Sequence, residues 1–222
     1  MHRHGRVGCA LAAVALVITG CQGHPGPGSS ASAAPEPTSA ESPRSLTSEP
    51  YVYTKAQLRP ALLRDADVPG LNSVALPRRL APCLGGAEPR LPAGAARVMR
   101  SFTNRDGHGS LIAQLTELPT LSGQAGNAAA SSFMTALRST WRSTAAGSET
   151  PYTISMLTPP VVAEDAYTVS VRSTHGAVPC QVVWLRQGDF LLRLDIGGEL
   201  QSRGAAQHYS ELAIASLKRA LA

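Results

Sequence analysis

The sequence has few lysines, few aromatic residues and no long apolar run. Only two of its 20 basic residues are lysines, and aromatic residues make up 5% of the chain. The apolar run near the start, residues 7–19, has 13 residues, whereas a membrane-spanning helix needs about 20. The formal net charge of +5 is modest for a chain of 222 residues. We therefore expect no membrane-spanning segment, and nothing indicates a nucleic-acid partner.

Several catalytic and metal-binding patterns are also missing. There is no Gly-x-Ser-x-Gly elbow, no glycine loop that would cradle phosphate, and no histidine pair with the i, i+4 spacing of a helical zinc site. Asp106, His108 and Ser110 are the residue types of a nucleophilic triad, but residues within one glycine-rich turn rarely reach one another with the required geometry. The sequence therefore predicts no enzyme, no metal and no cofactor. The alternative is an envelope hydrolase that uses these three residues.

The N-terminus has the form of a signal peptide. A basic opening, residues 1–6, precedes the apolar run, and small residues precede Cys21. The tetrad Ile18-Thr19-Gly20-Cys21 resembles the bacterial lipobox, at which the cysteine thiol is lipidated and becomes the mature N-terminus. This resemblance implies that residues 1–20 are removed and that a lipid on Cys21 anchors the chain to the extracytoplasmic face of the cell membrane. The alternative is an ordinary cleaved signal with an incidental cysteine.

The mature chain divides into a tether and a domain. Residues 21–50 are almost entirely Gly, Pro, Ser, Ala, Thr and Glu, a composition that cannot offset the entropy of ordering. We therefore expect a disordered tether, followed by one domain over residues 51–222. Arg3 and Arg6 leave with the signal peptide, which lowers the formal net charge from +5 to +3.

The cysteines indicate a single disulfide. Cys9 is lost with the signal peptide and Cys21 is lipidated, so that Cys83 and Cys180 remain as a pair in an oxidising compartment. No histidine lies at metal-ligand spacing from either cysteine. A Cys83–Cys180 bridge would close a long loop, for which the chain-entropy estimate is about 4.7 kcal/mol.

The apolar patterns predict an α+β domain with an antiparallel sheet of about six strands and two main helices. A capping box at Thr54 and Gln57 starts a first helix, which Pro60 should kink or restart. The two amphipathic helices imply one covered face of the sheet. The predicted strands are residues 97–103, 110–118, 152–157, 166–173, 181–187 and 190–196, the main helices are 122–146 and 204–221, and 70–96 is irregular.

The last two strands allow a detailed prediction. If Gly188-Asp189 is a two-residue turn, paired residue numbers sum to 377. Leu185, Val183 and Gln187, with their partners Leu192, Leu194 and Phe190, then form the core side. The pairs Trp184–Arg193, Val182–Asp195 and Arg186–Leu191, with Cys180, lie on the reverse side.

This reverse side suggests a ligand-binding surface. Arginine suits carboxylate or phosphate, and tryptophan offers a flat apolar floor. We therefore hypothesise a surface of Trp184, Arg186 and Arg193, with Arg172 expected to face the same way, for an anionic or amphiphilic envelope lipid, glycopolymer or partner protein. The alternative is structural: Trp184 packs under the segment near Cys83 and Arg193 stacks on it.

The predicted element order resembles a known group of secreted domains. Strand-strand-helix-four strands-helix is similar to the PsbP-like α/β sandwiches and to the extracellular sensor domains of mycobacterial serine/threonine kinases and their stand-alone lipoprotein relatives. Residues 62–70, LLRDADVPG, resemble an opening phrase of actinobacterial sensor-type lipoproteins, and the arginine bias is typical of a high-GC genome. The resemblance implies a non-catalytic sensor or binding module. Those kinase domains carry two disulfides, whereas this chain can form one.

Overall fold

Five stretches of the chain, residues 53–75, 88–119, 125–147, 152–173 and 179–222, are described by a computed structural model. All of them belong to the unit Thr47–Ala222. The predicted signal peptide, the tether, Cys21 and Cys83 lie outside the described residues. Within the described stretches, no helix combines the length and apolarity needed to cross a membrane.

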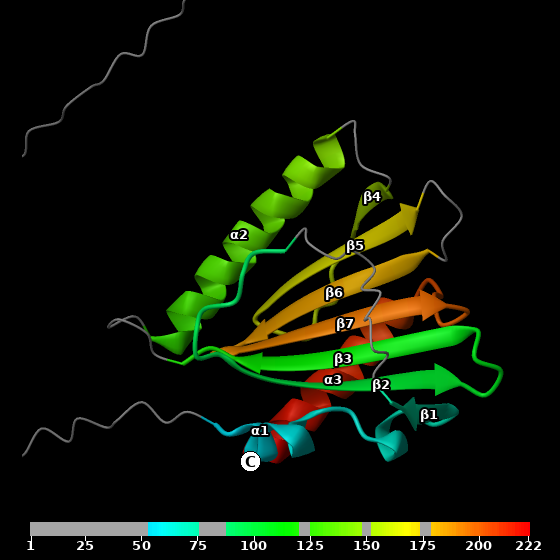
Figure 1. Cartoon of the computed structure of the whole chain (residues 1–222), viewed down its shortest axis with the longest axis horizontal. Coiled ribbons are helices and arrows are strands. Elements are labelled where there is room, and N and C mark those ends of the chain that lie inside the picture. The colour runs from blue at the N-terminus through cyan, green and yellow to red at the C-terminus, as the bar shows by residue number, and fades with distance from the viewer. Residues whose placement is uncertain (1–52, 76–87, 120–124, 148–151, 174–178) are drawn as a thin grey trace, which may run out of the picture. The chain divides into compact units, whose positions relative to one another are not determined.

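The sheet has seven antiparallel strands in the order β1-β2-β3-β7-β6-β5-β4 (Figure 1). The predicted α+β class and element order are confirmed, but a seventh strand, β1, lies in the stretch expected to be irregular. It was missed because it has only four residues and follows a Pro-Gly pair. The strands are β1 Leu71–Val74, β2 Ala96–Asn104, β3 Gly109–Glu117, β4 Tyr152–Leu157, β5 Asp165–Ser173, β6 Cys180–Gln187 and β7 Phe190–Gly198.

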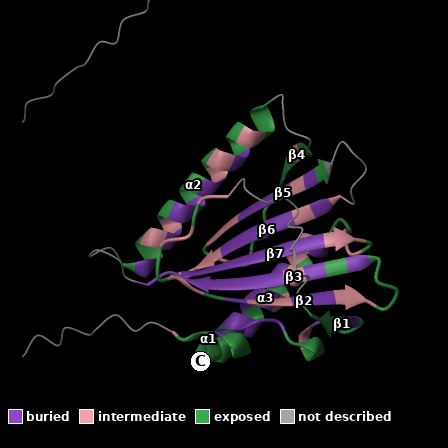
Figure 2. Cartoon of the chain, viewed as in Figure 1, coloured by how far each residue is buried: buried purple, intermediate pink, exposed green. Residues whose placement is uncertain are grey.

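Two long helices, α2 (Gly126–Ala146) and α3 (Ala205–Leu221), pack on opposite faces of this sheet. Both faces of the sheet are covered, because β6 is apolar on both sides. Val183 and Leu185 belong to the core with α3, whereas Val182 and Trp184 belong to the core with α2. We call these two sides the α3 face and the α2 face. Figure 2 shows the buried residues along the central strands.

The first helix ends just before Pro60, as the sequence predicts. In α1, Lys55–Leu58, the Thr54 side chain accepts from the Gln57 amide and the Gln57 side chain accepts from the Thr54 amide. This is the predicted capping box. Pro60 then lies in the 3-10 turn η1, Arg59–Ala61, where its missing amide hydrogen costs nothing.

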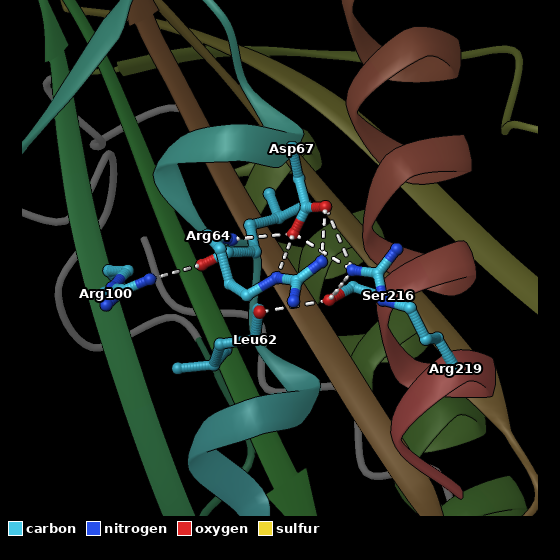
Figure 3. Close-up of polar contacts among 7 residues, drawn as sticks. Leu62, Arg64, Asp67, Arg100, Ser216 and Arg219 are labelled. Carbon is cyan, nitrogen blue, oxygen red and sulfur yellow. Dashed lines mark hydrogen bonds and ion pairs between the residues drawn. The ribbon is translucent and has the colours of Figure 1, made fainter. Parts of the chain in front are cut away.

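The last turns of α3 are tied to the segment after η1 (Figure 3). The Ser216 hydroxyl donates to the Leu62 carbonyl at 3.0 Å, and Arg219 donates to both oxygens of Asp67 at 2.9 and 3.1 Å. Asp67 belongs to the 3-10 turn η2, Asp65–Asp67, and also accepts from Arg64. The hydrogen bond from Arg64, with that from Arg219, lowers the pKa of Asp67 to about 2.

Candidate functional site

A charged cluster lies on the α2 face, at the middle of the sheet. The observed pairing of β6 and β7 has the predicted sum of 377 throughout and places Trp184 opposite Arg193. The pairing of β3 with β7 places Gln114 on the other side of Arg193. Paired residues share a sheet face, so Arg193 lies between an indole and an amide.

Arg193 is held by two carboxylates. Its Nε donates to Asp195 Oδ1 at 2.7 Å and its Nη2 donates to Asp195 Oδ2 at 3.0 Å. Nη1 donates to Glu88 Oε2 at 2.5 Å, and the guanidinium carbon lies 5.7 Å from the centroid of the Trp184 ring. Arg193 is only 8% exposed, Asp195 7% and Trp184 2%. A fork-to-fork pair of this kind fixes the guanidinium plane.

Burial dominates the electrostatics of this cluster. It raises the pKa of Glu88 and of Asp195, and the Arg193 cation opposes the rise at both carboxyls. Burial alone would lower the pKa of Arg193, but the charges of Asp195 and Glu88 outweigh it and raise that pKa. Arg193 is therefore a cation that already pairs with two carboxylates, the buried Asp195 and the half-buried Glu88. It has little charge left to offer a ligand.

Beside this cluster lies a cavity of about 450 Å³. Arg90 and Arg97 in its wall are exposed, and neither forms an ion pair with any described residue. Trp184 packs against Phe133 of α2, with ring centroids 5.2 Å apart, and both rings contribute to the wall. The full lining is Glu88, Pro89, Arg90, Leu91, Arg97, Gln114, Phe133, Trp184 and Arg193.

Two polar atoms in the cavity wall are buried without a completed hydrogen bond, namely Glu88 Oε1 and Trp184 Nε1. The indole lies close enough to the carboxylate to lower its pKa, against the larger effect of burial.

The four residues predicted to form a binding surface do not all lie on one face of the sheet. Trp184 and Arg193 are in contact, which both the binding hypothesis and the structural alternative predict. The contact is buried, which agrees with the structural alternative. Arg186 lies on the same face near the turn, where Glu164 binds it at 2.6 Å. Arg172 was placed on the wrong side: in the pairing of β5 with β6, even-numbered β5 residues share a face with Val183, so Arg172 lies on the α3 face.

The sequence analysis did not identify Arg90 and Arg97, the arginines of the cavity wall that form no ion pair with a described residue. Arg97 opposes Thr116 of β3, and Gln114 lies between Arg193 and Met99 of β2, so the α2 face is continuous across these strands. The signal that was available is the alternation within residues 96–104, which puts Arg97 and Val98 on opposite faces. No local signal indicates that β3 pairs with β7.

The possible triad is not assembled. Asp106 Oδ1 accepts from the backbone amide of His108 at 3.2 Å, which is turn chemistry. No hydrogen bond in the described part of the chain joins the side chains of Asp106, His108 and Ser110. The described residues also contain no group of three or more His, Cys, Asp or Glu side chains that could hold a metal ion.

Cys180, at the start of β6, is buried on the α2 face and is disulfide-bonded. Its predicted partner, Cys83, lies outside the described residues, so the pairing of these two cysteines stays a prediction. Its position does agree with the predicted side of the sheet, since Cys180 opposes Gly197 in the same register as Trp184 and Arg193.

Comparison with known proteins gives a likeness in fold alone. No protein-family model matches the sequence, and no curated protein matches it. Among solved structures, the extracellular domain of PknH from Mycobacterium tuberculosis is similar, with 10% identity and a TM-score of 0.46 over 78% of this chain and 98% of that one. An uncharacterized protein of Mycobacterium smegmatis, the Rv0999 ortholog, is similar with 12% identity and a TM-score of 0.36, over 74% and 95% of the two chains.

Proposed function

We propose that this chain is a non-catalytic binding module on the extracytoplasmic face of the cell membrane, and that the cavity beside Arg193 holds an anionic ligand with an apolar portion. The observation that carries the proposal is the pair of exposed arginines, Arg90 and Arg97, which form no ion pair with a described residue and lie in a cavity wall with two aromatic rings. The lipobox-like sequence at Cys21 supports the location. The predicted Cys83–Cys180 bridge is part of the same proposal.

The roles within the cavity differ between the three arginines. Arg193 is buried and neutralised, so it orders the floor of the cavity and fixes the Trp184 ring. Arg90 and Arg97 remain available to a carboxylate or phosphate, which the planar guanidinium binds well. Pro89 and Leu91, which are half-buried in the wall, supply the surface for the apolar portion, and the buried rings of Phe133 and Trp184 lie behind them. A cavity of about 450 Å³ lies within the range of small-molecule sites, about 300–1,000 Å³.

Dodecyl phosphate is a suitable probe, with the uncharged dodecanol as its control. Binding can be followed by tryptophan fluorescence, because Trp184 lines the cavity. The double variant Arg90→Gln, Arg97→Gln should weaken dodecyl phosphate binding at least about tenfold, which corresponds to about 1.4 kcal/mol, and should leave dodecanol unaffected. Arg105→Gln is the matched control, since Arg105 is an exposed arginine in the β2–β3 turn and is absent from the cavity wall. Equal affinities of the wild type and the double variant would refute the proposal.

A further inference from the structure

Strand β4 forms one edge of the sheet and carries no charge. Its sequence is Tyr-Thr-Ile-Ser-Met-Leu, and Tyr152, Met156 and Leu157 are 37%, 42% and 37% exposed. Proteins usually protect an edge strand with a charged side chain, a proline or a bulge, because its free N–H and C=O groups can pair with another strand. Within Tyr152–Leu157, neither a charge nor a proline is present.

The opposite edge of the sheet differs. Strand β1 has only four residues, and the Ser73 hydroxyl binds Asp65 of η2 at 2.8 Å. Short length and a neighbouring carboxylate both discourage pairing with a further strand. The two edges are therefore unequal, and β4 is the one able to extend the sheet.

We propose that β4 pairs antiparallel with β4 of a second copy of this chain. A two-fold axis perpendicular to the sheet requires paired residues to lie on the same face, which restricts the register to even sums of residue numbers. An axis through Ile154 pairs Tyr152 with Met156 twice, Thr153 with Ser155 twice, and Ile154 with itself.

This register is self-complementary in its chemistry. Tyr152, Ile154 and Met156 lie on the α2 face, because Ile154 and Met156 pair with Val171 and Val169 of β5. An aromatic ring opposite a thioether is a favourable contact. The Tyr167 hydroxyl, 2.7 Å from Met156 Sδ, holds that side chain in place. On the α3 face, Thr and Ser form a favourable cross-strand pair. No like charges meet along the strand.

Cysteine substitution tests the register directly. In Ile154→Cys the new thiols face each other across the axis, so oxidation of the full chain purified in detergent should give a disulfide-linked dimer on a non-reducing gel. Ser155→Cys is the matched control. Its two thiols would be offset by two residues, which places the Cα atoms about 8 Å apart, beyond the reach of a disulfide. The wild type reports any linkage through its own cysteines.

A charge variant tests the association itself. Thr153→Lys with Ser155→Lys sets like charges opposite each other twice, at exposed positions that leave the core unchanged. This variant should be monomeric by sedimentation velocity at concentrations where the wild type is dimeric, with an unchanged circular dichroism spectrum. Three outcomes would overturn the proposal: a monomeric wild type, equal linkage through positions 154 and 155, or a dimer that survives the two lysines.

Discussion

The two halves of the α2 face are built from different chemistry. On strands β5 and β6, which we call the helix half, most residues under α2 are apolar and buried, such as Val169 and Val182. On strands β2, β3 and β7, which we call the cavity half, the residues on the same face include Arg97, Gln114 and Arg193. One half is closed by packing against a helix, and the other presents a cavity with unpaired cations.

This difference separates stability from binding. The helix half gains from apolar burial, which is non-directional and has no free capacity for a ligand. In the cavity half, Arg193 binds two carboxylates, whereas Arg90 and Arg97 form no ion pair with any residue that the structure describes. The boundary between the halves is Trp184, which touches Phe133 of α2 on one side and Arg193 on the other.

The largest effect should come from the helix half. Trp141 of α2 is fully buried, so Trp141→Ala should lower the free energy of unfolding by about 3–5 kcal/mol through lost apolar burial and a cavity. Trp141→Phe is the control. It keeps a ring and removes an indole N–H that has no hydrogen-bond partner among the described residues, so it should cost clearly less. Urea unfolding measures both, and a small loss for Trp141→Ala would mean that α2 is not packed as described.

The cavity half should respond nearly as strongly to the loss of one charge. Asp195→Ala removes both of its hydrogen bonds to Arg193 and should cost about 3 kcal/mol, since a buried cation is then only partly neutralised. Replacing the whole cluster, by Arg193→Met, Asp195→Leu and Glu88→Gln, should cost less than the single change because no unpaired charge remains. If the triple variant proves the less stable in urea, the cluster contributes net stability.

The smallest effect concerns pH. Burial raises the pKa of Glu88 in the folded chain, so the folded state retains that proton more tightly than the unfolded state does. The free energy of unfolding therefore falls as the pH rises from the pKa of Glu88 in the unfolded chain to its higher pKa in the folded chain. Glu88→Gln cannot ionise, so its stability relative to the wild type should increase as the pH rises above about 4, near the ordinary pKa of a glutamate side chain. A relative decrease in urea midpoints would show that attraction by Arg193 outweighs burial.

Hydrophobic periodicity and turn residues in the sequence predict most of the helices and strands, and they predict the register of one strand pair, β6 with β7. Gly188 adopts a positive φ of 60° in the two-residue turn, and this turn fixes every pair of β6 with β7. The connection from β5 to β6 is longer and carries no such signal, which is why Arg172 was assigned to the wrong face. No tight turn at either end of β5 fixes the register of this strand.

The cavity could not be predicted, because it depends on contacts between distant residues. Arg193 meets Glu88 across 105 residues, and Gln114 meets Arg193 through the pairing of β3 with β7. Hydrophobic periodicity assigns a residue to a face but does not order the strands. The sequence therefore identifies Trp184 and Arg193 as neighbours, and only the fold shows that Arg90 and Arg97 carry the unpaired charge.

The tie between α3 and residues 62–67 has a mechanical consequence. Any tension on the chain that precedes Tyr53 is applied to a segment fastened to the body at several points, where Tyr53 donates to Glu117 of β3 and Ser216 and Arg219 bind Leu62 and Asp67. Load is thus shared between a central strand and the last helix before it reaches the short edge strand β1. We therefore expect that tension applied from this end breaks these contacts before it separates the strands of the sheet.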